Sequence, residues 1–225
     1  MDFLQRFLVY PLEDLAFVVA ALVIAFTIHE FSHAYAAYKF GDSTAKDQGR
    51  VTLDPRSHLD VIGTILIFIA GFGWAKPVPV VRSHFKYPRL MGIAVTAAGP
   101  VSNLALAFIG IVIHQILLVF GWDPEGSIGS RAIENFYFIF VDLNIILFIF
   151  NLIPLPPLDG YRIIEDLASN NLRARMKQYE QWGIIVFFLM ILIPPLRSLT
   201  IEPLFNLKFD IFLLFKSIIS VFVGG

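Results

Sequence analysis

Cysteine is absent from the whole chain of 225 residues. This absence excludes disulfide bonds, thiol nucleophiles and thiolate metal ligands, so His, Asp and Glu remain as the candidate ligands for a metal ion. Charge is also scarce, because only 16% of the residues are charged and the formal net charge is −1. A balance this close to zero gives no indication of a nucleic-acid partner. Internal repeats and low-complexity segments are missing as well.

Hydrophobic residues are abundant instead. They make up 57% of the chain, and the mean hydropathy is +0.73, far above that of an ordinary soluble domain. A membrane-spanning helix needs about 20 apolar residues, so several spans would use most of the chain. We therefore predict an all-α polytopic membrane protein with about five to six apolar helical segments, folded as one domain over residues 1–225.

The apolar segments divide into a core and a periphery. We expect core helices at about 12–40, 90–120 and 136–160, the last opened by the prolines of 154–157, which break a helix. Peripheral helices are expected within 180–223, where 204–223 either spans the membrane or lies at its interface. Residues 61–74 form a run too short to cross, which predicts a re-entrant segment or a short hairpin.

Basic residues support this layout, because Lys and Arg concentrate in cytoplasmic loops. Most of the seventeen Lys and Arg residues fall in three stretches. All three stretches lie on one side of the membrane only if residues 61–74 dip into the membrane and return. These are Lys39, Lys46, Arg50 and Arg56; Lys76, Arg82, Lys86 and Arg89; and Arg162, Arg173, Arg175 and Lys177.

A metal-binding pattern occurs within the first apolar segment. In His29-Glu30-Phe31-Ser32-His33 the two histidines are four residues apart, so a helix places them on one face, about 40° apart. Glu30 can then take a proton from a water on the metal. Ionisable residues inside a membrane helix are costly and usually functional.

A catalytic zinc site needs a third protein ligand. Asp159 follows the proline break close to the basic Arg162, at a depth similar to that of His33, and irregular backbone is tolerated where it lines a polar cavity. Asp142 competes, but the charge layout places it towards the outer end of its helix. We predict Asp159 as the ligand. Two imidazoles and a carboxylate suit zinc, although cobalt or manganese could occupy such a site in vitro.

These residues resemble the motifs of the site-2 proteases, which are intramembrane zinc metalloproteases. The resemblance covers His29–His33, the run from Asn151 to Gly160, Ala98–Asn103 and Gly73–Val80. The chain resembles a minimal form of this family, which has no apolar helix before the helix of the first motif and no PDZ or CBS domain. It implies three core helices holding one Zn²⁺ through His29, His33 and Asp159. It also implies a prokaryotic cytoplasmic membrane, with the active site facing the cytoplasm.

The same resemblance implies an endopeptidase that cleaves transmembrane or membrane-stub proteins, with Glu30 as general base. It suggests Asn151 as an amide donor to the oxyanion, although Asn151 could equally cap carbonyls freed at the helix break. Such an enzyme must bind its substrate extended. The alternating Val and Pro of residues 76–81 predict an irregular edge strand for this purpose, and a simple linker is the alternative. The candidate substrate-binding residues are Lys76, Pro77, Val78, Pro79 and Val80.

Two other functions remain open. A membrane zinc transporter or metal-binding protein would carry further polar ligands along a route through the bilayer, and only His114 and Asp142 could serve. An inactive relative would bind membrane proteins without cutting them, but all four proposed catalytic residues are present. Gly99, Pro100 and Asn103 are expected to serve close helix packing, and His114 a structural polar contact. No pattern indicates a particular substrate, regulator or oligomeric state.

Overall fold

The computed structural model describes residues 10–70 and 73–223. The described chain is mostly helical and contains no β-sheet. Its α-helices are α1 (Leu15–Lys39), α2 (Thr44–Asp47), α3 (Val61–Ala70), α4 (Pro88–Val119), α5 (Ile128–Asn151), α6 (Asp159–Leu167), α7 (Asn170–Leu192) and α8 (Pro194–Val223). Short 3-10 helices are η2 (Leu12–Asp14), η3 (Pro55–Ser57) and η4 (Arg82–His84).

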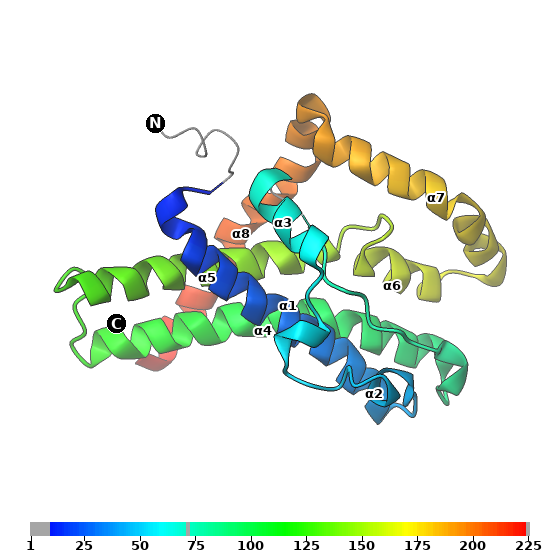
Figure 1. Ribbon diagram of the computed structural model, residues 1–225, viewed down its shortest axis with the longest axis horizontal. Helices are drawn as coiled ribbons and strands as arrows, with labels where there is room; N and C mark the ends of the chain where they lie inside the picture. Colours follow the sequence, from blue (N-terminus) through cyan, green and yellow to red (C-terminus); the bar gives the residue numbers. More distant parts are fainter. Residues whose placement is uncertain (1–9, 71–72, 224–225) are drawn as a thin grey trace.

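Helices α1, α4 and α5 form the centre of the molecule. The long α4 and α5 lie side by side, α1 crosses them, and α8 packs on the far side of the same pair (Figure 1). A cluster of Val18, Ala21, Leu22, Phe26 and Leu143 joins α1 to α5. Another cluster joins α4 and α5 to Ile219 of α8. Burial of these apolar side chains fixes the face that each helix turns towards its neighbours.

Local sequence signals set the helix boundaries. Gly41, with a φ of 103°, follows the end of α1, and Gly121, with a φ of 81°, follows the end of α4. Pro88 occupies the first position of α4, where its missing N–H is not needed. The Ser127 side chain caps α5 by accepting a hydrogen bond from the backbone N–H of Ser130, over 3.0 Å.

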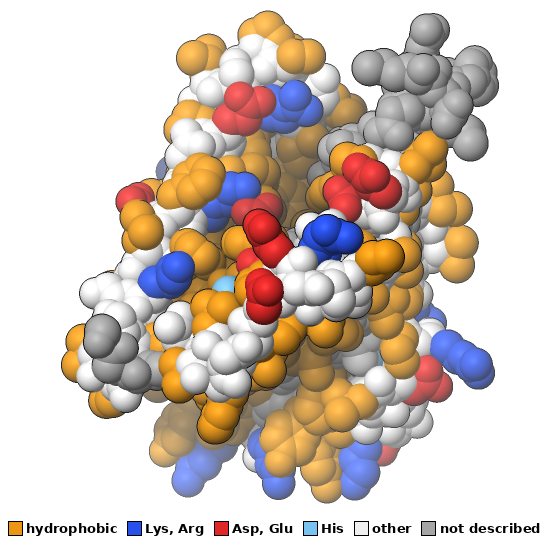
Figure 2. All heavy atoms as spheres, turned by 90° about the vertical axis from the view of Figure 1, so that its left-hand side faces the viewer, with side chains coloured by type: hydrophobic (Ala, Val, Ile, Leu, Met, Phe, Trp, Pro, Cys, Tyr) orange, Lys and Arg blue, Asp and Glu red, His pale blue; other side chains and the backbone are white. Residues whose placement is uncertain are grey.

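Three helical spans are long and apolar enough to cross a membrane. They are Leu12–Lys39, Pro88–Val119 and Ile128–Asn151, and α7 with α8, bent by 94°, would make a fourth if they form one span. Figure 2 shows hydrophobic side chains over much of the face viewed, with acidic and basic side chains near its middle. The protein is therefore an integral membrane protein. Five to six spans are not confirmed by the described residues, because α3 has only ten residues and α7 and α8 count as at most one span together.

Several boundaries differ from the sequence prediction. The third core helix begins at Ile128 rather than at 136, because the Ser127 cap starts it within a polar stretch, and it ends at Asn151 rather than at 160. Helix α7 begins at Asn170 rather than near 180. Pro194 starts α8, so the final helix is longer than 204–223 and extends alongside α4 and α5.

The predicted edge strand over 76–81 is not confirmed. In the described part of the chain the only isolated β-bridge joins Leu59 to Ala75, and residues 76–81 after it belong to no helix or strand. A strand needs a neighbour to pair with, and the prolines at 77 and 79 remove two donors. The expected re-entrant segment contains the ten-residue α3, too short to cross, while Gly71 and Phe72 lie outside the described residues.

Candidate active site

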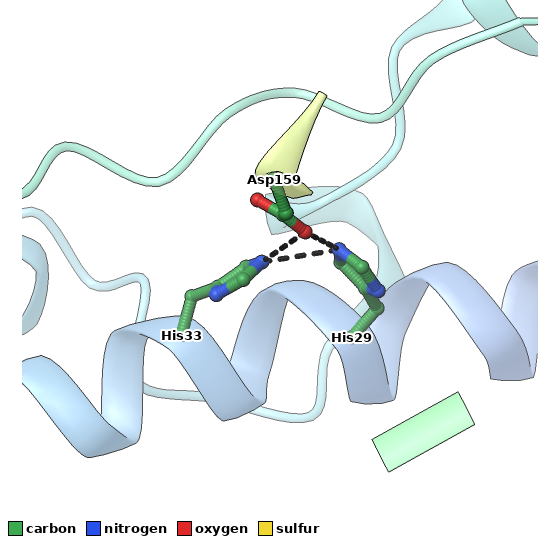
Figure 3. A group of neighbouring side chains, drawn as sticks. All are labelled: His29, His33 and Asp159. Carbon is green, nitrogen blue, oxygen red and sulfur yellow. Dashed lines mark hydrogen bonds and ion pairs between the residues drawn. The ribbon is translucent and has the colours of Figure 1, made fainter. Parts of the chain in front are cut away.

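His29, His33 and Asp159 converge at the centre of the molecule. The two histidines project from one face of α1, and Asp159, the first residue of α6, points at them from across the gap (Figure 3). The two Nε2 atoms are 3.0 Å apart, and Asp159 Oδ2 lies 3.3 Å from that of His29 and 3.4 Å from that of His33.

The chain between α5 and α6 delivers Asp159 to this point. Prolines at 154, 156 and 157 prevent α5 from continuing, and the chain turns back towards α1. Gly160 allows the turn to be tight, because a Cβ at this position would lie only 2.3 Å from the carbonyl oxygen of Leu152. The pairing of Asp159 with Gly160 is thus explained by a close approach of two backbone segments.

Each histidine ring is held by a hydrogen bond at its Nδ1 atom, the nitrogen that faces away from Asp159. His29 Nδ1 lies 2.6 Å from Asn103 Oδ1, and His33 Nδ1 lies 2.8 Å from the carbonyl oxygen of Val95. Both partners are acceptors, so each Nδ1 carries the hydrogen and donates it. Each Nε2 therefore keeps a free lone pair, which is the form in which histidine binds metals.

These groups fit a zinc ion. Two nitrogen lone pairs and a carboxylate oxygen face one another without a hydrogen between them, an arrangement that a cation stabilises. Asp159 Oδ2 is buried and has no hydrogen-bond partner in the described chain. In tetrahedral coordination with bonds of 2.0–2.1 Å, ligand atoms are about 3.3 Å apart, close to the separations given above.

Glu30 lies in the same cavity and makes no direct contact in the ligand cluster. The cavity has a volume of about 750 Å³ and is lined by side chains of α1, α4, α5, α6 and the segment after α3. Glu30 is 8% exposed, so a water beside it would be shielded from bulk solvent. Arg50 is a cation whose charge interacts with that of Glu30. Burial lowers the pKa of its guanidinium, and the charge of Glu30 opposes this shift.

Asn151 lines the cavity at the end of α5. Its Nδ2 donates to the carbonyl oxygen of Leu147, one turn earlier in α5, over 3.0 Å. A primary amide has two N–H groups, so one remains for a second acceptor.

The segment 76–80 also borders the cavity and is anchored by two buried charged side chains. Arg50 donates to the carbonyl oxygens of Lys76, over 2.6 Å, and Pro77, over 3.0 Å. Asp42, fully buried, accepts from the N–H of Val81 over 2.6 Å. The backbone groups of Val78 and Val80 make no hydrogen bond within the described chain.

A network of ion pairs holds the far end of α6. Glu165 and Asp166 are each 1% exposed. Asp166 pairs with Arg82 of η4 over 2.8 Å, and Glu165 pairs with Arg162 over 3.1 Å, while Arg173 of α7 approaches both carboxylates. Burial raises the pKa of Glu165, but its hydrogen bond with Arg162 and the surrounding positive charges outweigh burial and leave the pKa below its usual value.

Asp142, which competed as a ligand, and His114, predicted as a structural polar contact, both lie elsewhere. Asp142 pairs with Lys208 of α8 over 2.7 Å, and His114 pairs with Glu134 over 2.8 Å. The only described group of His, Asp and Glu residues arranged to hold a metal is the cluster in Figure 3.

Two residues have a closer relation to the site than the sequence indicated. A Cβ on Gly99 would lie 2.3 Å from His33 Nε2 and 2.6 Å from His29 Nε2, so this glycine leaves space in front of the two candidate ligands. Asn103, one turn further along α4, contacts His29. The sequence predicted both for helix packing. Only a prediction of which α4 face meets α1 could have indicated their place at the site.

Comparison with known proteins finds relatives that are described as metalloproteases. The model of peptidase family M50 matches residues 119–194. A candidate zinc metalloprotease of Bacillus subtilis, YwhC, is 53% identical over 203 residues, covering 90% of this chain and 92% of that protein. Rip2 of Mycobacterium tuberculosis H37Rv, also described as a candidate zinc metalloprotease, is 30% identical over 185 residues, covering 80% and 68%. No solved structure matches the chain.

Proposed function

The chain belongs to peptidase family M50, the site-2 protease family, and is a zinc metalloendopeptidase embedded in a membrane; from this premise we propose that it cleaves transmembrane or membrane-stub proteins. The observation that carries the proposal is the convergence of His29, His33 and Asp159 beside Glu30 in one cavity that opens between membrane helices. We assign one zinc ion to the three ligands.

Each residue has a distinct task in the proposed reaction. Zinc, when bound, supplies Lewis-acid polarisation of the scissile carbonyl and of water. Glu30 accepts the proton of the attacking water at a carboxylate oxygen and returns it to the nitrogen of the leaving amine. The free N–H of the Asn151 amide donates to the developing oxyanion, while its other N–H holds Leu147.

Substrate binding is proposed at residues 76–80. A transmembrane helix hides its peptide bonds in its own hydrogen bonds, so it must be extended before cleavage. The unpaired backbone groups of Val78 and Val80 are suited to pair with an extended chain. The structure contains no strand here, and on this proposal the substrate itself supplies the partner strand. Lys76, Pro77 and Pro79 keep the segment extended beside the cavity.

The proposed location is the cytoplasmic membrane of a prokaryote, with the cavity open to the cytoplasm. The support is the charge layout: Arg50, Arg82 and Arg162 all lie near the cavity, and basic residues favour the cytoplasmic side.

Replacing Glu30 by Gln tests the proposal. The wild type and Glu30→Gln, both purified in detergent, are given a membrane-stub model substrate, and bound zinc is measured in each. We expect equal zinc and a loss of cleavage by a factor of about 10² to 10⁴, because the amide cannot accept the proton. Glu134→Gln removes another acidic group outside the cavity and should cleave like the wild type.

The other outcomes point to other functions. If the wild type binds zinc but cuts none of a broad panel of membrane substrates, a transporter or an inactive relative explains the site better. If the wild type binds no zinc, the ligand assignment is wrong.

A further inference from the structure

A chain of buried amides extends from His29 into the helix core. Asn103 of α4 and Asn144 of α5 are both fully buried. Asn103 Nδ2 lies 3.0 Å from Asn144 Oδ1, and Asn103 Oδ1 lies 2.6 Å from His29 Nδ1. Asn144 touches neither a proposed ligand nor the cavity, so neither its position in the sequence nor the proposed reaction gives it a role.

Two main-chain carbonyls fix the direction of each hydrogen bond that links the two asparagines to each other and to His29. Asn144 Nδ2 donates to the carbonyl oxygen of Phe140 over 2.8 Å, which turns its Oδ1 towards Asn103. Asn103 Nδ2 donates to the carbonyl oxygen of Ala25 over 3.3 Å as well as to Asn144. A flipped amide at either position would set oxygen against oxygen.

The consequence reaches the metal site. With both amides fixed, the atom that Asn103 presents to His29 is its acceptor oxygen, so His29 must carry its hydrogen on Nδ1. We propose that Asn103 and Asn144 together act as positioning residues that hold His29 in the tautomer and orientation needed to bind zinc. This inference rests on the proposed zinc site and adds a residue of α5 to its support.

The two ligand histidines thus have different supports. His33 bonds directly to a carbonyl of α4, that of Val95. His29 is supported by side chains in series, which also tie α1, α4 and α5 together at the depth of the site. Such outer partners of metal ligands commonly change metal affinity about 10-fold to 100-fold when they are replaced.

The test measures zinc affinity, not cleavage. The full chain in detergent is titrated with zinc alone against a chromophoric chelator, as wild type, Asn144→Leu, Asn103→Leu and the double variant. We expect Asn144→Leu to bind zinc about 10-fold to 100-fold more weakly. The double variant should bind no more weakly than Asn103→Leu, because Asn144 acts only through Asn103.

Two further variants guard the interpretation. Asn144→Thr removes the amide but keeps a hydroxyl for the carbonyl of Phe140, so it should fold even if Asn144→Leu fails to fold, and it should still lose zinc affinity. Thr27→Val is the matched control. Thr27 is buried on α1, and its hydroxyl has no partner in the described chain, so this change should leave zinc affinity unaltered.

The outcomes separate the two proposals. Unchanged zinc affinity in folded Asn144→Thr, with normal binding by the wild type, overturns the positioning role and leaves the proposed function standing. Losses that add independently in the double variant also overturn it, since they indicate an effect on packing alone. A wild type that binds no zinc overturns both proposals.

Discussion

At the scale of single residues, the site depends on a missing side chain as much as on those present. Gly99 faces the two Nε2 atoms at a distance where a methyl group would overlap them. Its backbone is helical, so the glycine is not required by a turn. The space that it leaves is the space into which the two proposed ligand histidines point.

Gly99→Ala should therefore weaken zinc binding by about tenfold or more, because the added methyl group pushes a histidine ring out of position. Alanine favours a helix over glycine, so the helix itself is not expected to unfold. Titration with zinc in detergent, together with circular dichroism, measures both effects. Gly129→Ala adds a methyl group to α5 that meets only Ser127 Oγ, at an ordinary contact distance of 3.7 Å, and should bind zinc normally; equal affinity in the two variants would contradict the steric role.

The sequence could predict the proximity of His29 and His33 because helical periodicity is local. The position of Asp159 near these histidines could be predicted because a proline break next to an acidic residue is visible in the sequence. The roles of Gly99, Asn103 and Asn144 could not, since they depend on how three helices rotate against one another. That rotation is set by the summed packing of many apolar side chains.

At the scale of elements, the helices were easiest to predict where a clear stop signal follows an apolar run. Lys39 and Gly41 end α1 close to the predicted 40, and Pro88 starts α4 close to the predicted 90. The predicted start of α5, at residue 136, was wrong because the polar residues after Ser127 make its first turns look unlike an apolar helix. The strand was not confirmed because strand pairing is not local.

The segment 76–80 gives a prediction of its own. Arg50 holds two consecutive carbonyls, and a lysine cannot hold both in the same geometry. Arg50→Lys should raise the KM for a membrane-stub substrate about tenfold, comparable to losing one hydrogen bond to a charged group. Kinetics at varied substrate concentration provide the measurement.

The control for this change is Arg56→Lys, at an exposed position of η3, which should leave KM unaltered. Zinc content should be the same in all three proteins. A KM in Arg50→Lys equal to that of the wild type would argue against substrate binding along this segment.

At the scale of the whole molecule, charge and apolar burial stabilise different regions. The spans pack through apolar clusters, while the buried carboxylates of α6 pair with η4 and α7. The pKa of Glu165 is lowered in the folded protein, since Arg162 and its neighbours outweigh the effect of burial. The resulting stability is present above the pKa of the unfolded carboxyl and is lost as pH falls through the lower, folded pKa.

We therefore expect the melting temperature in detergent to be level near neutral pH and to fall below about pH 4. Glu165→Gln should melt at a lower temperature at neutral pH and show a shallower acid dependence. Glu125→Gln, at an exposed loop position, should follow the wild type at every pH. A wild-type melting temperature that does not change in acid would show that these ion pairs contribute little.

Helix α6 connects these two regions. Asp159 stands at its first residue, among the membrane helices, and Glu165 and Asp166 stand near its last, among cations outside the candidate spans. The nine residues of α6 connect the two groups, so the ion pairs of Glu165 and Asp166 at one end also affect where the carboxylate of Asp159 lies at the other. If the proposed function holds, the salt and pH of the surrounding water act through α6 on a cleavage reaction inside the bilayer.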